Sequence, residues 1–166
     1  MGHLRPVKDP LRTALAARLL PAASRIQVLH LGGALSEEMA TEARSEAARN
    51  RRYHWLGELS RSEALGVLSR CRLLSLTSEL EGGANVIVEA VTSGVPVIAS
   101  RICGNVGMLG RDYDGYFAVG DVGELSALLA RVSTDESFLE HLRQQCAQRA
   151  PLFAPAREAA EVNALI

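Results

Sequence analysis

Two glutamates separated by a glycine turn are the residues of this chain whose types and spacing best suit ligand binding. Glu81 begins Glu81-Gly82-Gly83, and Glu89 follows after seven intervening residues, inside a segment that predicts a helix. A carboxylate that accepts hydrogen bonds from sugar hydroxyls forms charge-assisted bonds worth about 1.5–3 kcal/mol each. The glycines permit unusual backbone angles and close approach of a ligand, and the first N–H groups of a helix attract phosphate. These residue types suit a ligand with many hydroxyls and a phosphate, such as a nucleotide sugar.

The same two glutamates also have an ordinary structural interpretation. Glu81 could cap the helix that follows, and Glu89 could lie on a solvated helix face, which is the commoner situation on spacing alone. Glu89, however, is flanked by apolar residues, and a carboxylate in an apolar helix needs a polar partner. Its neighbours are Val86, Ile87, Val88, Ala90 and Val91.

Composition excludes several classes of protein. The chain has 166 residues, 48% of them hydrophobic and 22% charged, with a formal net charge of -1. This length predicts one domain with a sizeable core, and the charge leaves no basic footprint for nucleic acid or anionic membrane. No apolar run is long enough to predict a transmembrane segment. The three cysteines fit neither a disulfide framework nor zinc spacing. We therefore expect a cytoplasmic protein with no metal and no cofactor.

Strand-like and helix-like segments alternate along the chain. This order predicts βαβ units, and hence an α/β domain with a Rossmann-like, mostly parallel sheet and helices on both faces. Such sheets bind ligands at the carboxyl ends of their strands. The chain enters this pattern with Met1-Gly2-His3-Leu4, which is too short for a full strand. Strands are expected over residues 25–31, 53–56, 72–76, 95–99 and 116–119, and helices over 11–20, 36–49, 60–70, 85–93, 121–132, 135–149 and from 156 onward.

The stretch from Ser78 to Ser100 resembles the C-terminal half of retaining glycosyltransferases of the GT-B fold, family 4. That family shows Ser-x-x-Glu-Gly, a second Glu after seven residues, and then Gly-x-Pro-Val-Ile-Ala-Ser. The matching residues here are Ser78, Glu81-Gly82, Glu89 and the run from Gly94 to Ser100. The segments around Gly32-Gly33, Tyr53 to Gly57 and Asp112 to Asp121 are similar to further family motifs, so the resemblance covers nearly the whole chain.

The resemblance implies a role for each matched position. Glu81 would contact the hydroxyls of the donor sugar, and Glu89 would hold the nucleotide ribose. The family lysine that holds the diphosphate matches Lys8, the only lysine in the chain. The family arginine of that element falls on His3, and Arg5 is the nearest replacement. The backbone groups expected beside the donor belong to Gly82, Gly83, Ala84, Asn85 and Val86.

The resemblance further implies that residues 1–166 form a nucleotide-sugar-binding C-terminal domain. Its partner would be an N-terminal acceptor domain that this chain lacks, and the donor would be a UDP-sugar. The segments from His3 to Pro10 and from Glu81 to Val86 look closest to the selenosugar synthase branch, which joins selenophosphate to a sugar. One departure is the loop after the Pro-Val strand, which reads Cys103-Gly104-Asn105-Val106-Gly107 where the family has Gly-Gly-x-x-Glu. A GT-B epimerase, a phosphorylase-like enzyme and a non-catalytic α/β binding module remain alternatives.

Overall fold

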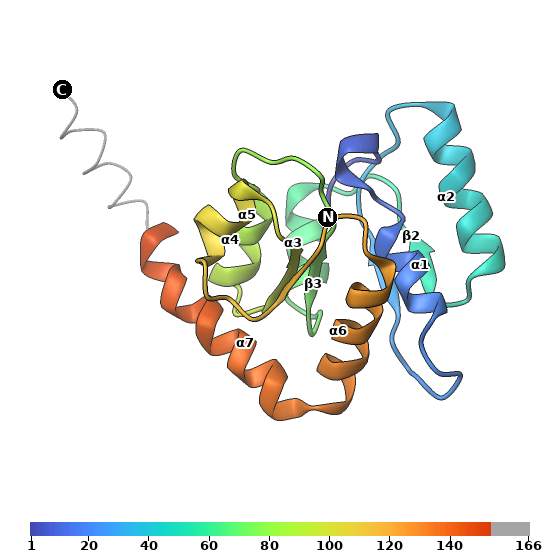
Figure 1. The fold of residues 1–166 in the computed structure, drawn as a ribbon. Helices are drawn as coiled ribbons and strands as arrows, with labels where there is room; N and C mark the ends of the chain where they lie inside the picture. Colours follow the sequence, from blue (N-terminus) through green and yellow to red (C-terminus); the bar gives the residue numbers. More distant parts are fainter. Residues whose placement is uncertain (154–166) are drawn as a thin grey trace, which may run out of the picture.

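The strands form two parallel sheets. The computed structural model describes residues 1–153. Strand β1 (Val28–His30) pairs with β2 (Tyr53–Trp55), while β4 (Val97–Ser100) lies between β3 (Leu74–Leu76) and β5 (Tyr116–Phe117). The α/β class with parallel strands and helices on both sides is confirmed (Figure 1). The strands are shorter than the sequence predicts, and they form two sheets rather than one continuous sheet.

The helices follow the predicted order with three additions, one of which is the 3-10 turn η2 after α7. The expected helix from residue 156 lies outside the described residues. A 3-10 turn, η1, and a short helix, α5, were not predicted from the sequence. The helical segments are η1 (Pro6–Lys8), α1 (Arg12–Arg18), α2 (Glu37–Arg49), α3 (Arg61–Leu68), α4 (Asn85–Thr92), α5 (Cys103–Leu109), α6 (Val122–Thr134), α7 (Glu136–Arg149) and η2 (Ala150–Phe153).

Local signals fix several helix ends. The predicted capping box of α3 is present, with the Ser60 and Glu63 side chains each bonded to the other residue's backbone N–H. Asp121 and Asp135 accept hydrogen bonds from the first turns of α6 and α7. Gly94, just beyond α4, has a φ of 72°, the left-handed conformation that commonly ends a helix. These ends direct the chain back to the sheet after each helix.

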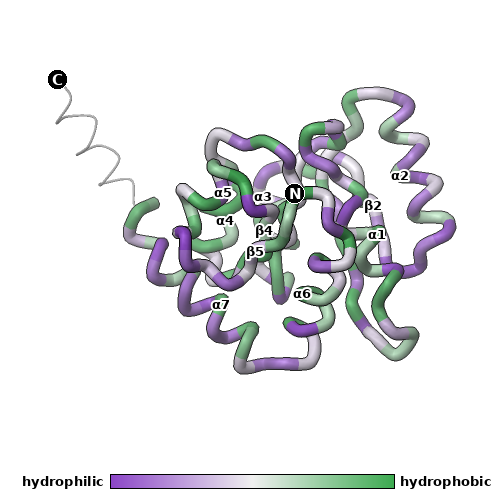
Figure 2. The backbone as a smooth tube through the Cα atoms, in the orientation of Figure 1, coloured by the Kyte–Doolittle hydropathy of each residue, from purple (hydrophilic) through white to green (hydrophobic). Residues whose placement is uncertain are grey.

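The core centres on β4. Val97, Ile98 and Ala99 are fully buried, and Ile87 of α4 and Leu142 of α7 belong to the same apolar cluster. Full burial of one such branched side chain contributes about 1.5–3 kcal/mol. Figure 2 shows hydrophilic residues concentrated on outer helices such as α2. No helix within residues 1–153 is long and apolar enough to cross a membrane.

A buried carboxylate joins α1 to α2. Glu46 is fully buried, and its Oε1 accepts a hydrogen bond of 2.9 Å from Nε of Arg18, whose Nη2 bonds Oε2. Asn50 donates to the same Oε1 at 2.8 Å, and Nε of Arg49 lies 3.2 Å from Oε2. A buried charge is tolerated only with such partners, so this cluster fixes α2 beside the β1–β2 sheet.

Candidate functional site

Lys8 and Glu81 meet at the carboxyl ends of the strands. Their positions differ by 73 residues, yet the Lys8 ammonium donates to Oε1 of Glu81. The Ser78 hydroxyl donates to the same oxygen at 2.7 Å. The Glu81 side chain is 10% exposed and that of Lys8 is 31% exposed. The structure therefore brings together the only lysine and the first of the two glutamates that the sequence singles out.

The backbone around Lys8 is fixed by the residues that follow β3. Oγ1 of Thr77 donates to the carbonyls of Lys8 and Asp9, at 3.0 and 2.8 Å. The Glu79 N–H donates to the Val7 carbonyl at 2.9 Å. Asp9 has a φ of 42°, so the chain reverses sharply after η1. The end of β3 thus holds the segment that carries the ammonium.

Helix α5 packs closely against the backbone of Glu81. A Cβ built on Gly104 would lie 2.1 Å from the Glu81 carbonyl oxygen, so only glycine permits this approach. Asn105 is fully buried and donates to the Ser100 carbonyl at 2.9 Å, and the Ser100 hydroxyl donates to the Ser78 carbonyl. A buried chain of hydrogen bonds therefore leads from α5 through Ser100 to Ser78, whose hydroxyl bonds the Glu81 carboxylate.

The N-terminus of α4 is open. Its N-cap, Ala84, has no capping side chain, and its own N–H points to Sδ of Met108 at 3.2 Å. Asn85 is exposed. The Ile87 N–H bonds the Ala84 carbonyl at 2.8 Å, so the N–H groups that the helix start leaves available to an anion are those of Asn85 and Val86. Neither Gly82 nor Gly83 has a positive φ. A Cβ on Gly82 would meet nothing within 4 Å, so that position is open to a ligand.

Glu89 lies in the middle of α4 with a partner from another helix. Its side chain is 20% exposed, and Oε1 lies 3.6 Å from Nη2 of Arg61, the first residue of α3. This position is half-buried rather than a solvated helix face, which agrees with the need for a partner inferred from its apolar neighbours. No sequence pattern singled out Arg61, because its only local context is the capping box from Ser60 to Glu63, which contains it.

Arg5 and His3, the two candidates for the second positive charge beside Lys8, have different surroundings. Arg5 is exposed, and its carbonyl accepts a 3.0 Å bond from the Lys8 N–H. His3 turns toward the glycine loop after β1, since a Cβ on Gly33 would lie 3.5 Å from its Nδ1 and 3.2 Å from Oε2 of Glu58. That Nδ1 is buried without a hydrogen-bond partner within the described chain. Arg5 therefore has the freer side chain of the two.

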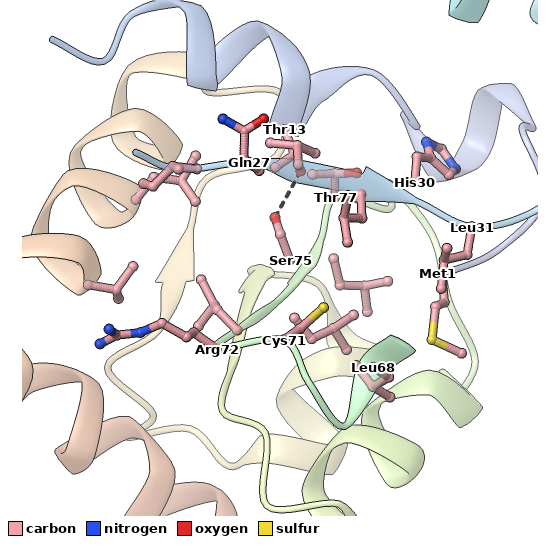
Figure 3. A pocket seen from close by; sticks show the side chains of 18 of the residues that line it. Met1, Thr13, Gln27, His30, Leu31, Leu68, Cys71, Arg72, Ser75 and Thr77 are labelled. Carbon is pink, nitrogen blue, oxygen red and sulfur yellow. Dashed lines mark hydrogen bonds between the residues drawn. The ribbon is translucent and has the colours of Figure 1, made fainter. Parts of the chain in front are cut away.

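A cavity of about 600 Å³ lies beside this site, between β1 and β3 (Figure 3). We call it the interstrand slot. It shares Lys8 and Ser78 with the site but reaches neither Glu81 nor Glu89. Thr13 of α1 and Ser75 of β3 bond across one part of it at 2.8 Å. The slot is thus adjacent to the predicted donor site and distinct from it.

His30 ends β1 at the slot and is uncharged at neutral pH. Its pKa is lowered from 6.5 to about 4, chiefly by burial and also by the nearby chain amine, while a contact with the Gly2 carbonyl opposes the shift. Nδ1 lies 3.1 Å from the Tyr53 hydroxyl, and Nε2 lies 3.2 Å from the Gly2 carbonyl oxygen. Both ring nitrogens therefore have structural partners. Within residues 1–153 no three His, Cys, Asp or Glu side chains are grouped to hold a metal ion.

Comparison with known proteins gives consistent results. A galactosyltransferase of Escherichia coli, UDP-Gal:alpha-D-GlcNAc-diphosphoundecaprenol alpha-1,3-galactosyltransferase, is 28% identical over 153 residues, which cover 88% of this chain and 38% of that protein. The structure of Anabaena HepE with UDP and glucose superposes with a TM-score of 0.81 at 21% identity, over 99% of this chain and 48% of that one. The same protein with UDP-glucose gives 0.81 at 20% identity, over the same shares.

The chain therefore spans less than half the length of these relatives. The model of the family described as glycosyl transferases group 1 matches residues 1–152. The matched residues include every residue of the site described above. The fold also agrees with that of GT-B enzymes. The chain belongs to the group 1 glycosyltransferases.

Proposed function

We propose that this chain is the donor-binding domain of a retaining, two-domain glycosyltransferase that uses a UDP-sugar. The observation that carries the proposal is the meeting of Lys8 and Glu81 beside the open N-terminus of α4. One ammonium and a set of unpaired N–H groups suit a diphosphate. The carboxylates suit hydroxyl groups. The E. coli and Anabaena relatives are named for UDP-sugars or carry UDP, which supports the choice of nucleotide.

Each residue has a role in this proposal. Lys8 and the N–H groups of Asn85 and Val86 hold the diphosphate. Glu81 accepts hydrogen bonds from the donor sugar, and Glu89 accepts them from the ribose. Gly82, Gly83 and Ala84 let the sugar approach the backbone, since open space surrounds Gly82. Arg5, exposed and one turn from Lys8, supplies the second positive charge.

The reaction breaks the bond between the anomeric carbon of the sugar and the terminal phosphate oxygen. The leaving diphosphate takes the electron pair, and the acceptor forms its bond on the same face of the sugar. Lys8 and the helix N-terminus stabilise the charge that develops on the leaving group, an electrostatic contribution that is commonly the largest in such sites. Because Ser78 also bonds Glu81, the carboxylate keeps one donor when Lys8 turns toward phosphate.

Calorimetric titration tests the donor. UDP, UDP-glucose, UDP-GlcNAc and GDP-mannose are titrated separately, and we expect the UDP ligands to bind and GDP-mannose to bind at least tenfold more weakly. Glu89→Ala and Lys8→Ala each weaken UDP binding at least tenfold. Glu42→Ala is the matched control, because Glu42 is exposed on α2 and far along the chain from the site. A folded chain that binds none of the four ligands would favour a non-catalytic module and overturn the proposal.

Product analysis with the full enzyme tests the reaction and the acceptor. The resemblance of the segments 3–10 and 81–86 to selenosugar synthases makes selenophosphate the proposed acceptor. We expect UDP and a selenium-linked sugar phosphate that retains the anomeric configuration of the donor. An isomerised sugar nucleotide would instead identify an epimerase. Glycosylation of another acceptor under the same conditions would remove only the selenophosphate assignment.

A further inference from the structure

We propose that Met108 and Arg149 are positioning residues for the donor turn, which we define as residues 81–84. Arg149 fixes the carboxyl end of α5, and the Met108 side chain transmits that position to the end of the turn. Neither residue was singled out from the sequence, and neither has to contact the ligand in order to act. The inference rests on the proposed donor site, because it names the residues that keep the sugar side of that site in place.

Two residues on one face of α5 contact the two ends of the donor turn. Gly104 and Met108 are four positions apart, so they lie one above the other on the same face of the helix. Gly104 packs against the Glu81 backbone at the start of the turn, where there is no room for a Cβ. Sδ of Met108 accepts the Ala84 N–H at 3.2 Å, at the end of the turn. Helix α5 therefore fixes the donor turn at both ends.

The bond to Met108 matters because Ala84 is buried. Ala84 is 4% exposed and directly precedes the first residue of α4. A buried backbone N–H needs an acceptor, and a thioether sulfur is a weak one, so its position decides whether the N–H is satisfied. A Cβ on Gly83 would lie 3.9 Å from the same sulfur. Loss of this acceptor would loosen the end of the turn and the N-terminus of α4 that follows it.

Arg149 fixes the backbone of Met108 from another helix. Its Nε donates to the Met108 carbonyl at 2.8 Å, and its Nη2 donates to the Gly107 carbonyl at 3.1 Å. Carbonyls in the last turn of a helix lack intrahelical partners, and a basic side chain there is favourable. Arg149 is the last residue of α7, which ends beside α5 (Figure 1). Because a guanidinium is a rigid planar fork, two bonds to successive carbonyls fix the orientation of this helix end.

Helix α5 depends on such contacts for its position. It has seven residues, and an isolated helix of that length is not stable in water. Strand β5 adds a second attachment, since the Tyr116 hydroxyl lies 2.8 Å from the Gly110 carbonyl oxygen and 3.2 Å from that of Asn105. The bonds from α7 and β5 to the carboxyl-terminal part of α5 therefore place Met108 against the donor turn.

A fixed donor turn should favour binding of the sugar more than binding of the nucleotide. In the proposed function Glu81, Gly82 and Gly83 belong to the sugar side, whereas Lys8 and Glu89 lie outside the turn. Groups that are already positioned lose less entropy when a ligand binds. Loosening the turn should therefore weaken UDP-glucose binding more than UDP binding. The ratio of the two affinities reports on the turn, while partial loss of the fold would weaken both ligands equally.

Three methionine variants separate the acceptor from packing. Met108→Leu keeps the apolar volume and removes the acceptor. Met108→Gln keeps the length of the side chain and supplies a carbonyl acceptor. Met39→Leu is the matched control, because Met39 is also partly buried but lies on α2. Hydrogen exchange of the Ala84 amide is measured without ligand, and calorimetry gives the affinities for UDP and UDP-glucose.

We expect Met108→Leu to speed exchange at Ala84 about tenfold, because a buried N–H loses its acceptor. Its affinity for UDP-glucose should fall about threefold or more, and its affinity for UDP less than about twofold. Met108→Gln and Met39→Leu should behave like the unchanged chain. If Met108 only fills space, the polar Met108→Gln should be the more damaging variant, and that order would overturn the proposal.

Arginine variants test the second part of the proposal. Arg149→Met removes the donors and keeps the apolar stem, and Arg143→Met is the control, because Arg143 pairs with Glu140 of its own helix. Arg149→Met should reproduce the loss seen in Met108→Leu, and Arg143→Met should not. Arg149→Lys covers the case in which Arg149→Met does not fold. An ammonium is not a fork, so this variant should also lose UDP-glucose affinity in preference to UDP affinity.

The double variant Met108→Leu with Arg149→Met tests whether the two residues act in series. If Arg149 acts through Met108, the double variant should lose no more UDP-glucose affinity than the weaker of the two single variants. Independent residues would instead give the product of the two losses, about ninefold for two threefold effects. The product would show that Arg149 does not position the turn through Met108, and it would overturn that part of the proposal.

Failure of this inference is distinguishable from failure of the donor site. If the unchanged chain binds UDP-glucose and Lys8→Ala weakens it, while the Met108 and Arg149 variants bind like their controls, the donor site stands and the positioning roles are wrong. If the unchanged chain binds neither UDP nor UDP-glucose, the donor site is overturned, and this inference is overturned with it.

Discussion

Gly104→Ala is expected to disrupt the candidate site through a single backbone contact. The added Cβ would lie 2.1 Å from the carbonyl oxygen of Glu81 and 2.8 Å from its carbonyl carbon. Ordinary contact begins at 3.4 Å, so α5 and the Glu81 backbone must separate by more than an ångström. The nearest atoms are backbone, and the turn cannot relieve the clash by rotating a flexible side chain.

Two losses follow from this displacement. Forcing an extra methyl into a close-packed contact costs about 1–3 kcal/mol of stability. The Glu81 carboxylate also leaves the positions at which Lys8 and Ser78 bond it. Misplacement of a positioned group by about 1 Å can cost about a hundredfold in a productive complex. We expect the affinity for UDP-glucose to fall at least tenfold, which corresponds to about 1.4 kcal/mol.

Gly107→Ala is the matched control in the same helix. A Cβ at Gly107 would meet nothing within 4 Å, and the residue is exposed. Replacing glycine by alanine inside a helix gains about 0.5–1 kcal/mol from propensity. The control should therefore unfold at a slightly higher temperature and bind UDP-glucose like the unchanged chain. The difference between the two variants isolates the contact with Glu81 from the gain in helix propensity.

Urea unfolding gives the stability of each variant, and calorimetry gives its affinity for UDP-glucose. Affinity is measured at a temperature at which all three chains are folded, so that loss of fold does not count as loss of binding. If Gly104→Ala bound UDP-glucose as tightly as Gly107→Ala, the position of Glu81 would not matter for the donor. The role proposed for α5 as the support of the site would then be wrong.

Two further predictions concern stability. Arg18→Ala should lower the free energy of unfolding by about 2–3 kcal/mol, and Arg49→Ala should lower it by less than about 1 kcal/mol. The two variants differ because Arg18 makes two bonds to the buried Glu46 and Arg49 makes one. Equal losses of stability in urea unfolding would contradict this prediction. Burial, together with the nearby chain amine, lowers the pKa of His30 from 6.5 to about 4, so the folded state disfavours its protonation. This stabilising contribution is complete above pH 6.5 and is lost toward pH 4, by at most about 1.4 kcal/mol per pH unit. Unfolding measured at pH 7, 6 and 5 should show a flatter pH dependence for His30→Gln, and an unchanged slope would refute the prediction.

Sequence patterns predicted the order of elements because their signals are local. The capping box at Ser60, the aspartate caps of α6 and α7, and Gly94 after α4 each act within one turn of chain. The pairing of Lys8 with Glu81 spans 73 residues, and no local pattern contains it. The presence of both residues at one site was expected only because a family motif places both positions at one ligand, and their direct contact was not expected.

The parts that the sequence did not predict depend on tertiary contacts. Helix α5 has two glycines among its first five residues, a poor helix composition. The structure explains one of them, since Gly104 packs on the Glu81 backbone. The break between the two sheets is likewise a property of strand pairing. The cytoplasmic location and the absence of a cofactor were inferred from composition alone and stay predictions.

The segment that carries Lys8 is held on two sides. Thr77 and Glu79 after β3 bond it on one side, and the pairing of residues 2–4 with the end of β1 holds it on the other. A group that is already positioned loses less entropy when a ligand binds. Both sets of contacts should therefore favour binding of a diphosphate at the Lys8 ammonium.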